Sequence, residues 1–218
     1  MQRYLAACVV LTVGLSAPAR AQTIDRIMAV VGGEIILLSD VNAAIRFGLV
    51  EPRPGAADPV RAALDALIDR QLQLFEVNRY LPPEPEPSAI DERLTGIRQQ
   101  FGGEQAVRSA LAEVGMSDAQ LRSRVRDNLR IASYRAQRFG AALQPSEEDL
   151  LRFYRTHEAD FTKDGVPQPF VAVRGEVRAR LVGERSTALI NEWLDMLRRR
   201  TDLQILYAGG SPASGAAA

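Results

Sequence analysis

Three residue types that often carry protein chemistry are nearly missing from this 218-residue sequence, which has one cysteine, one histidine and one lysine. Zinc sites and metalloprotease motifs need several cysteine or histidine ligands, so Cys8 and His157 alone exclude them. Neither the G-x-S-x-G motif of hydrolases nor the glycine pattern of a P-loop occurs. We therefore expect no catalytic residue, no cofactor and no metal site. His157 is expected at the edge of a packed helix face, with a pH-sensing or ligand role as the alternatives.

The first residues are typical of a secretory signal, because Arg3, an apolar run over 4–17 and a small-residue "ARA" follow one another. The run is shorter than the roughly 20 residues of a membrane span. We expect cleavage after Ala21, with a retained anchor, or lipidation of Cys8 in "LAAC", as the alternatives. Cleavage would remove Arg3 and Arg20 but no acidic residue, which leaves a net charge of −2 and no cysteine.

The first pair of glycines after the signal separates two β-branched runs, Ile27–Val31 and Glu34–Leu38. Two glycines between such runs predict a tight β-hairpin. A dinucleotide-binding turn would need a third glycine and a helix directly after it, and neither follows Gly32 and Gly33. Both faces of the hairpin are apolar, so we expect other elements to cover it. Ser39 is the expected cap of the next helix.

The rest of the sequence predicts a mainly α fold, with helices over 40–49, 59–80, 88–101, 105–114, 118–143, 146–161 and 171–197. Asp58-Pro59 and Ser117 with Gln120 are strong helix-start signals. Proline-rich residues 81–88 form a stiff spacer, and 162–169 form a loop. A final strand, Leu203–Tyr207, is expected to pair with the hairpin, before a disordered tail over 208–218.

The helix predicted over 118–143 carries many arginines, which raises the question of nucleic-acid binding. They surround an apolar stripe predicted at helical spacing, made of Leu121, Val125, Leu129, Ala132, Ala136 and Phe139. The chain without its signal is not basic and is expected to be exported. We therefore expect a solvated or acid-paired face and no nucleic-acid partner.

Four segments, "IDRIMAVVGGEIILLSDVNAAI", "ALIDRQLQLFEVNRYL", "AIDERLTGIRQQFGG" and "LRSRVRDNLRIASYRAQRFGAAL", follow one another in an order that resembles the N-terminal domain of SurA, the periplasmic chaperone. The ending "ALINEWLDMLRRRTDLQILY" resembles the helix and strand that close the same module. The resemblance implies one module over 22–207, with a hairpin and helices to about 161 and a closing helix and strand over 170–207. SurA-like proteins usually carry parvulin prolyl isomerase domains before the closing segment, and here there is no room for one.

The resemblance implies an ATP-independent holdase that binds unfolded outer-membrane or other exported polypeptides in the periplasm, without isomerase activity. The low specificity of such binding fits exposed apolar area with arginine and aromatic side chains around it. The candidate client-binding residues are Tyr80, Phe101, Met116 and Phe139, and the alternative is that they belong to the core. A subunit that docks one envelope partner and a residual isomerase are the alternative functions. No stable membrane insertion is expected, and a domain-swapped homodimer is an open alternative.

Overall fold

The computed structural model describes residues 25–52, 55–163 and 165–209, and the expected signal over 1–21 and most of the expected tail over 208–218 lie outside these ranges. The fold is mainly helical with a small antiparallel sheet, which confirms the predicted fold class. Within the described residues the elements are β1 (Ile27–Val31), β2 (Glu34–Leu37), α1 (Leu38–Phe47), α2 (Pro59–Tyr80), α3 (Pro87–Phe101), α4 (Glu104–Glu113), α5 (Asp118–Phe139), α6 (Glu147–Thr156), the 3-10 turn η1 (Glu158–Phe161), β3 (Thr162–Lys163), β4 (Val166–Pro167), α7 (Phe170–Arg200) and β5 (Leu203–Ile205).

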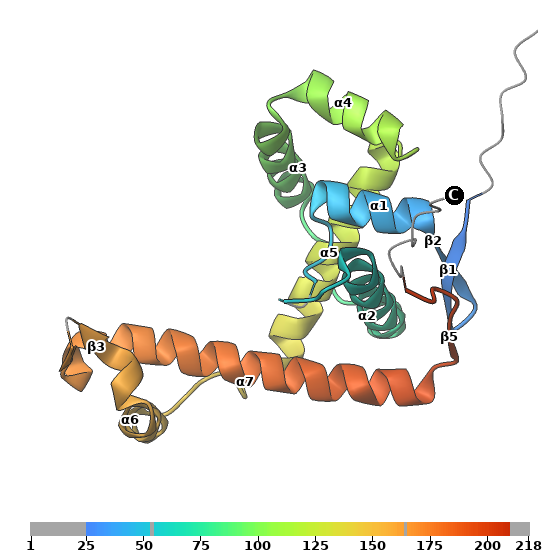
Figure 1. Ribbon diagram of the computed structural model, residues 1–218. Helices are drawn as coiled ribbons and strands as arrows, with labels where there is room; N and C mark the ends of the chain where they lie inside the picture. The colour runs from blue at the N-terminus through green and yellow to red at the C-terminus, as the bar shows by residue number, and fades with distance from the viewer. Residues whose placement is uncertain (1–24, 53–54, 164, 210–218) are drawn as a thin grey trace, which may run out of the picture.

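The sheet joins the two ends of the described chain. Gly32 and Gly33 have φ angles of 56° and 89°, which a two-residue turn between β1 and β2 requires. The closing strand β5 runs antiparallel to the other side of β1, with Ala29 opposite Ile205, and the strand order is β2-β1-β5. The predicted hairpin and its predicted pairing with the closing strand are therefore confirmed (Figure 1).

The main part of the molecule, which we call the body, holds two apolar cores. The first lies under the sheet, where α2, the second half of α5 and the end of α7 bury Met28, Leu64, Ile68, Leu72 and Trp193. The second lies between α1, α3, α4 and the first half of α5, and its buried members include Phe47, Ile90, Leu94, Val107 and Leu121. Helix α5 thus changes neighbours along its length, from the second core to the first.

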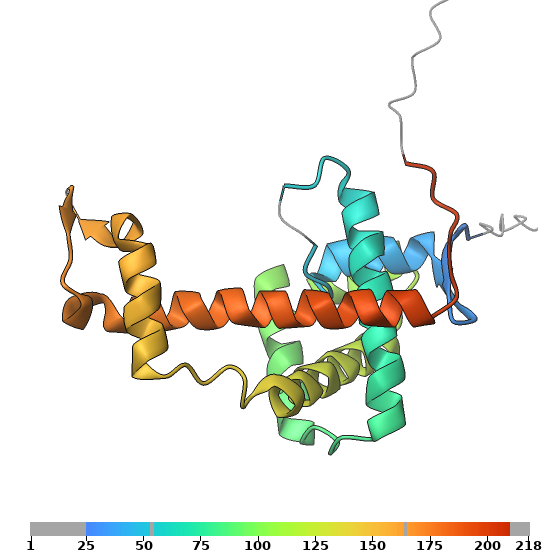
Figure 2. The same ribbon diagram turned by 90° about the horizontal axis from the view of Figure 1, so that it is seen from below.

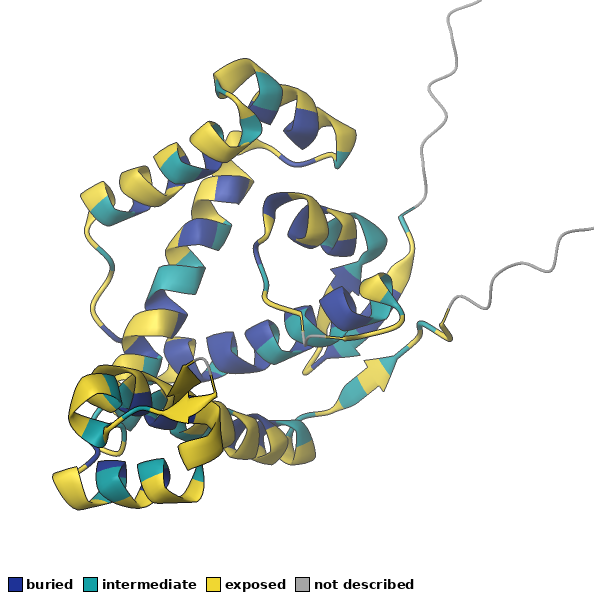
Figure 3. Cartoon of the chain, turned by 60° about the vertical axis from the view of Figure 1, so that its left-hand side comes forward, coloured by how far each residue is buried: buried dark blue, intermediate teal, exposed yellow. Residues whose placement is uncertain are grey.

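A smaller lobe, which we call the arm, consists of α6, η1, the β3–β4 hairpin and the first half of α7. Its buried core is small and consists of Leu150, Phe153, Phe161, Val177 and Leu181. Figure 2 shows α7 running from the arm across the body, and Figure 3 shows that the arm is largely exposed. Leu181, in the arm, and Leu197, in the body, are separated by about 160° around the helix axis at 100° per residue. One helix therefore packs with nearly opposite sides in the two lobes.

Several local predictions are wrong. Ser39 does not cap α1, because the helix begins at Leu38 and the Ser39 hydroxyl donates a hydrogen bond to the carboxylate of Asp25 instead. Ala132 and Ala136 are exposed on α5, since the buried side of its second half is formed by Ile131 and Tyr134. The expected loop over 162–169 contains the short β3–β4 hairpin, and the outer face of the β1–β2 hairpin is not covered by any described element.

Candidate functional site

A row of four aromatic rings crosses the body where α2, α5 and α7 meet. Tyr80 at the end of α2 stacks on Tyr134 of α5, with 5.7 Å between ring centroids. Tyr134 lies 5.8 Å from Trp193 of α7, and Trp193 makes an edge contact with Phe139 of α5 at 5.6 Å. We call these four residues the aromatic row. Such offset and edge contacts add stability beyond the area they bury.

The row is buried in its middle and exposed at the Tyr80 end. Trp193 and Tyr134 are core residues, whereas 58% of Tyr80 is exposed and 73% of Leu81 beside it. Because Tyr80 stacks on a buried ring, its ring is held in one place although most of the residue is exposed. The row therefore presents a preformed apolar surface to solvent.

Leu81 has a backbone conformation that is unusual for leucine. Its φ is 46°, and it is the one non-glycine with positive φ among the residues that the structure describes. It ends α2 with its N–H donating to the carbonyl of Val77. Glycine is the usual residue at such a left-handed helix end, and a side chain there costs about 1–2 kcal/mol. The chain thus keeps a large, exposed apolar side chain at a position where glycine would be more stable.

Arginines lie over the rings of the aromatic row. The guanidinium of Arg138 is 5.5 Å from the ring centroids of both Phe139 and Trp193, and that of Arg79 is 5.9 Å from Tyr80. Cation–π contacts of this kind are strongest when they are desolvated. A bound chain that covers Tyr80 would also find arginine donors at the edge of the same surface.

The four candidate residues separate into two pairs. Tyr80 and Phe139 belong to the aromatic row, whereas Met116 is buried in the second core. Phe101 is partly buried in the same core, where it stacks on Phe47 at 4.9 Å and lies under Arg46. The sequence pattern does not indicate Tyr134 or Leu81 as parts of a site, because the first interrupts the expected stripe of α5 and the second follows the predicted helix.

A hollow of about 210 Å³ opens beside the second core, between α3, α4 and α5. Its apolar lining is Leu94, Val107 and Leu121. Arg98 and Arg122 also line it, but each already pairs with an acid: Arg98 with Glu104 at 2.7 Å and Arg122 with Asp91 at 2.5 Å. The hollow is suited to an apolar side chain rather than to an anion.

The arginines of α5 are mostly paired with acids. Beyond Arg122, the side chain of Arg124 pairs with Asp40 of α1, and Arg130 lies 3.1 Å from Glu84 in the linker between α2 and α3. Such paired charges do not form the unpaired basic stripe that nucleic acid attracts. These ion pairs link α5 to α1, to α3 and to the linker between α2 and α3.

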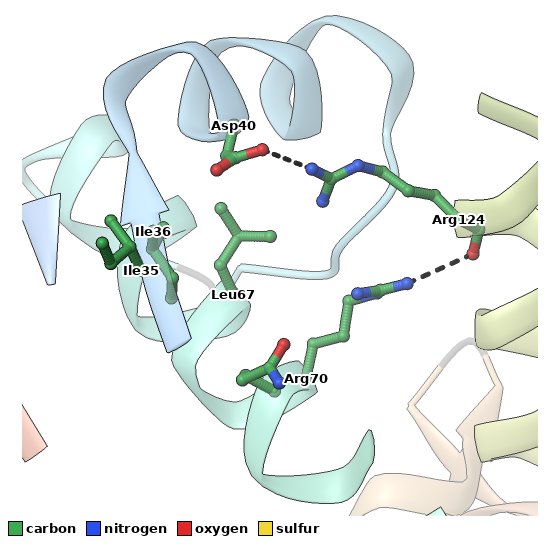
Figure 4. A pocket seen from close by; sticks show the side chains of 7 residues that line it. Ile35, Ile36, Asp40, Leu67, Arg70 and Arg124 are labelled. Carbon is green, nitrogen blue, oxygen red and sulfur yellow. Dashed lines mark hydrogen bonds and ion pairs between the residues drawn. The ribbon is translucent and has the colours of Figure 1, made fainter. Parts of the chain in front are cut away.

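A second, smaller hollow of about 80 Å³ lies between β2 and α5 (Figure 4). Arg70 of α2 and Arg124 of α5 reach it from two sides, and Asp40 from a third. The Nε of Arg70 donates to Asn128 at 2.7 Å, and its Nη2 donates to the carbonyl of Arg124 at 3.4 Å. Burial lowers the pKa of the Arg70 guanidinium, and the neighbouring charge of Arg124 lowers it further.

His157 lies in the arm, away from both hollows. Its ring stacks on Phe153 at 4.1 Å, and its Nδ1 is 3.0 Å from the Phe153 carbonyl. This is the packing position that the sequence predicts.

Across the described ranges no group of histidine, cysteine, aspartate and glutamate side chains is arranged to hold a metal ion. In the same part of the chain, no helix has the length and apolar character to span a membrane. No protein-family model matches the sequence, and no curated protein matches it. The geometry of the surfaces described above is therefore the basis for a functional proposal.

Proposed function

We propose that the protein is an ATP-independent, SurA-like chaperone of the periplasm, which holds unfolded outer-membrane or other exported polypeptides. The observation that carries the proposal is the exposed Tyr80–Leu81 end of the aromatic row. Exposed apolar area beyond isolated residues marks interaction surfaces in soluble proteins. A chaperone without an energy source needs such a surface, since it must bind many sequences weakly and release them.

The rigidity of the aromatic row supports this function. Tyr80 stacks on buried Tyr134, which contacts Trp193, so little side-chain freedom remains to be lost when a client binds. Low ordering cost and large contact area are the reasons that tyrosine is common in binding surfaces. The nearby Arg79 and Arg138 supply hydrogen-bond donors that adapt to different client backbones.

The same proposal includes the absence of prolyl isomerase activity. Only residues 162–169 lie between η1 and α7, which leaves no room for a parvulin domain there. We propose that the arm, with its exposed Val166 and Val171, extends the surface available to a client instead.

The direct test uses the chain from Gln22 onward and an unfolded outer-membrane barrel protein diluted from urea, with light scattering as the readout. We expect suppression of aggregation at near-stoichiometric ratios without ATP. A proline-limited refolding assay with the same preparation should show no acceleration. Aggregation at the rate of the client alone would overturn the general chaperone function and favour a subunit with one dedicated partner.

A further inference from the structure

The middle of α7 is not packed into the core of either lobe. Leu181 is the last buried residue of the arm core, and Trp193 is the next buried residue along the helix. Residues 182–192, which we call the link, are all described by the structure and none of them is buried, although Ile190 packs partly against the first core of the body. The link covers about three helical turns at 3.6 residues per turn. Figure 2 shows it as the part of α7 between the arm and the body.

The amino acids of the link favour a helix only weakly. Glycine is the least favourable residue in a helix interior after proline, and β-branched residues, serine and asparagine are also poorer than alanine or leucine. The link contains several residues of these types: Val182, Gly183, Ser186, Thr187, Ile190 and Asn191. Because most helices in proteins are stabilised by tertiary packing, a helical stretch with weak propensities and little packing is the easiest part of α7 to bend.

Gly183 is the weakest point of the link. An added Cβ there would have no neighbour within 4 Å, so no close contact requires a glycine. The hydroxyl of Thr187 donates a hydrogen bond to the Gly183 carbonyl at 3.0 Å. A bond of this kind, to the carbonyl four residues earlier, slightly destabilises a helix and often bends it. Glycine and a back-bonding hydroxyl therefore act on the same turn.

The part of α7 before Gly183 belongs firmly to the arm. Val177 and Leu181 are buried in the arm core, and Arg174 pairs with Glu147 of α6 at 2.7 Å. The other connection between arm and body, residues 140–146, contains turns and no helix. The arm can therefore move as one unit when α7 bends.

Two ion pairs cross Gly183 along α7. Arg180 pairs with Glu184 at 3.2 Å, but both side chains are exposed and such a pair contributes little. Arg185 lies on the body side of the glycine and pairs with Asp149 of α6 at 3.1 Å, in a less exposed position. A bend at Gly183 separates Arg185 from α6, so this second pair favours the straight helix.

We propose that α7 bends at Gly183, so that the arm changes its angle to the body, and that the Arg185–Asp149 pair holds the straight form. A bend of about 20°, the size of a distinct helix kink, moves a residue about 16 Å along the helix, such as Ala172, by about 6 Å. The bend thus adjusts the separation of the aromatic row from the exposed Val166 and Val171 of the arm. This use of the bend rests on the proposed holdase function, whereas the bend itself does not.

The test measures arm–body distances by double electron–electron resonance in the chain from Gln22 onward, which has no cysteine of its own. One nitroxide label is placed in the arm at Ala172→Cys. The other is placed on α5 of the body, at Ala132→Cys in one sample and at Ala119→Cys in another, so that bends in different directions are detected. All three positions are exposed. We expect a distance distribution that contains a second population, displaced by about 6 Å, for at least one label pair.

Two glycines of the same helix provide the variant and its matched control. Gly183→Ala should reduce the ratio of bent to straight form about fivefold, which corresponds to about 1 kcal/mol. Gly175→Ala makes the same change at another open position of α7, within the arm, and should leave the distribution unchanged. Arg185→Gln removes the pair with Asp149 and should act in the opposite direction, by increasing the bent form. The fluorescence of Trp193 reports whether each variant is folded.

Three results would overturn the hinge. They are a single narrow distance in the wild type for both label pairs, a broad distribution that Gly183→Ala leaves unchanged, and equal narrowing by Gly175→Ala. A loss of the bent form in Arg185→Gln would overturn the role of the ion pair.

Light scattering with the same variants separates the hinge from the holdase function. Gly183→Ala should need up to about fivefold more protein than Gly175→Ala for equal suppression of aggregation, since apparent affinity follows the fraction of the competent form. Equal suppression by the two variants would overturn the use of the bend in client binding. A wild-type protein that bends as expected but does not suppress aggregation would overturn the holdase function and leave the hinge in place.

Discussion

Gly32 and Leu81 both have positive φ, but only Gly32 is the residue type that this backbone conformation favours. Gly32 has φ of 56° in the hairpin turn, and a Cβ there would be 2.9 Å from the ring of Phe75 and 3.3 Å from the methyl group of Thr201. The absence of a side chain is therefore required by both conformation and space. Leu81, by contrast, has the same conformation with a large side chain directed to solvent. Gly32 serves the fold, whereas Leu81 belongs to the surface that we propose binds clients.

We predict that Gly32→Ala is more destabilising than Gly33→Ala. Both substitutions put a side chain at positive φ, which costs about 1–2 kcal/mol, but only Gly32 also has close neighbours. In Gly32→Ala the added clash should lower the free energy of unfolding by a further ~1–3 kcal/mol. Urea denaturation followed by Trp193 fluorescence measures both variants. Equal stability of the two would show that Phe75 moves aside freely.

The sequence predicts individual residues well where the interaction is local. The Ser117–Gln120 capping box and the Asp58 cap of α2 are confirmed, because each involves residues three apart in the chain. Ser39 is wrong because its hydroxyl bonds to Asp25, 14 residues away, and a local pattern carries no sign of that partner. Ile45 fits the helical spacing of α1 but is exposed, since α1 packs against two cores with other faces.

At the scale of elements, α7 and α5 each serve two environments. In α7 the arm core and the body contact nearly opposite sides, and in α5 the buried side changes between Val125 and Ile131. A single stripe extended along the whole helix therefore fails in the second half of α5. Helix positions could be predicted from spacing and caps, but the rotation of the buried face depends on neighbours that spacing does not reveal.

The arm should lose stability in acid before the body does. A hydrogen bond from Arg174 lowers the pKa of Glu147, and the Ser146 N–H, followed by Arg185, lowers the pKa of Asp149. Because these pKa values are below those of the unfolded chain, the stabilisation is full above about pH 4.5 and is lost as pH falls through the folded values. The buried core of the arm is small, so little apolar burial offsets this loss of stability.

Amide hydrogen exchange at pH 6 and at about pH 3.5 measures this prediction. Exchange in α6 should accelerate on acidification more than exchange in α2. In Glu147→Gln the arm should already exchange faster at pH 6 and change less with acid. Equal acceleration of amide exchange in the arm and the body would contradict the prediction that Glu147 and Asp149 make the arm more sensitive to acid.

At the scale of the whole molecule, the closing segment brings the two ends of the described chain together. Arg198 of α7 pairs with Asp69 of α2 at 2.5 Å, and Arg200 pairs with Glu76, beside the strand that completes the sheet. The sequence allows this closure to be predicted, because a lone terminal strand needs a partner and the hairpin is the available one. The exposed outer face of the sheet could not be predicted in this way, since apolar pattern alone suggests that it is covered.

The candidate surface could be predicted only in part. Tyr80 and Phe139 are joined into one row by Tyr134 and Trp193, whereas Met116 is a core residue and Phe101 is largely one. Aromatic and apolar residues have the same pattern in a core and in an exposed surface. Which of them lies at the surface depends on how α2, α5 and α7 cross.

The central claim is that unfolded clients are held at the exposed end of the aromatic row. It is tested most directly by light scattering with the variant Tyr80→Ser/Leu81→Gly, which removes the exposed apolar side chains and places glycine at the left-handed helix end. We predict a folded protein, in which relief of the left-handed conformation at position 81 offsets part of the lost Tyr80–Tyr134 contact. It should need about fivefold more protein for equal suppression of aggregation, as expected for a loss of about 1 kcal/mol in client affinity. Ile45→Ser, which changes an exposed apolar residue of α1, should suppress aggregation like the wild type. Full suppression by the Tyr80→Ser/Leu81→Gly variant would contradict the account.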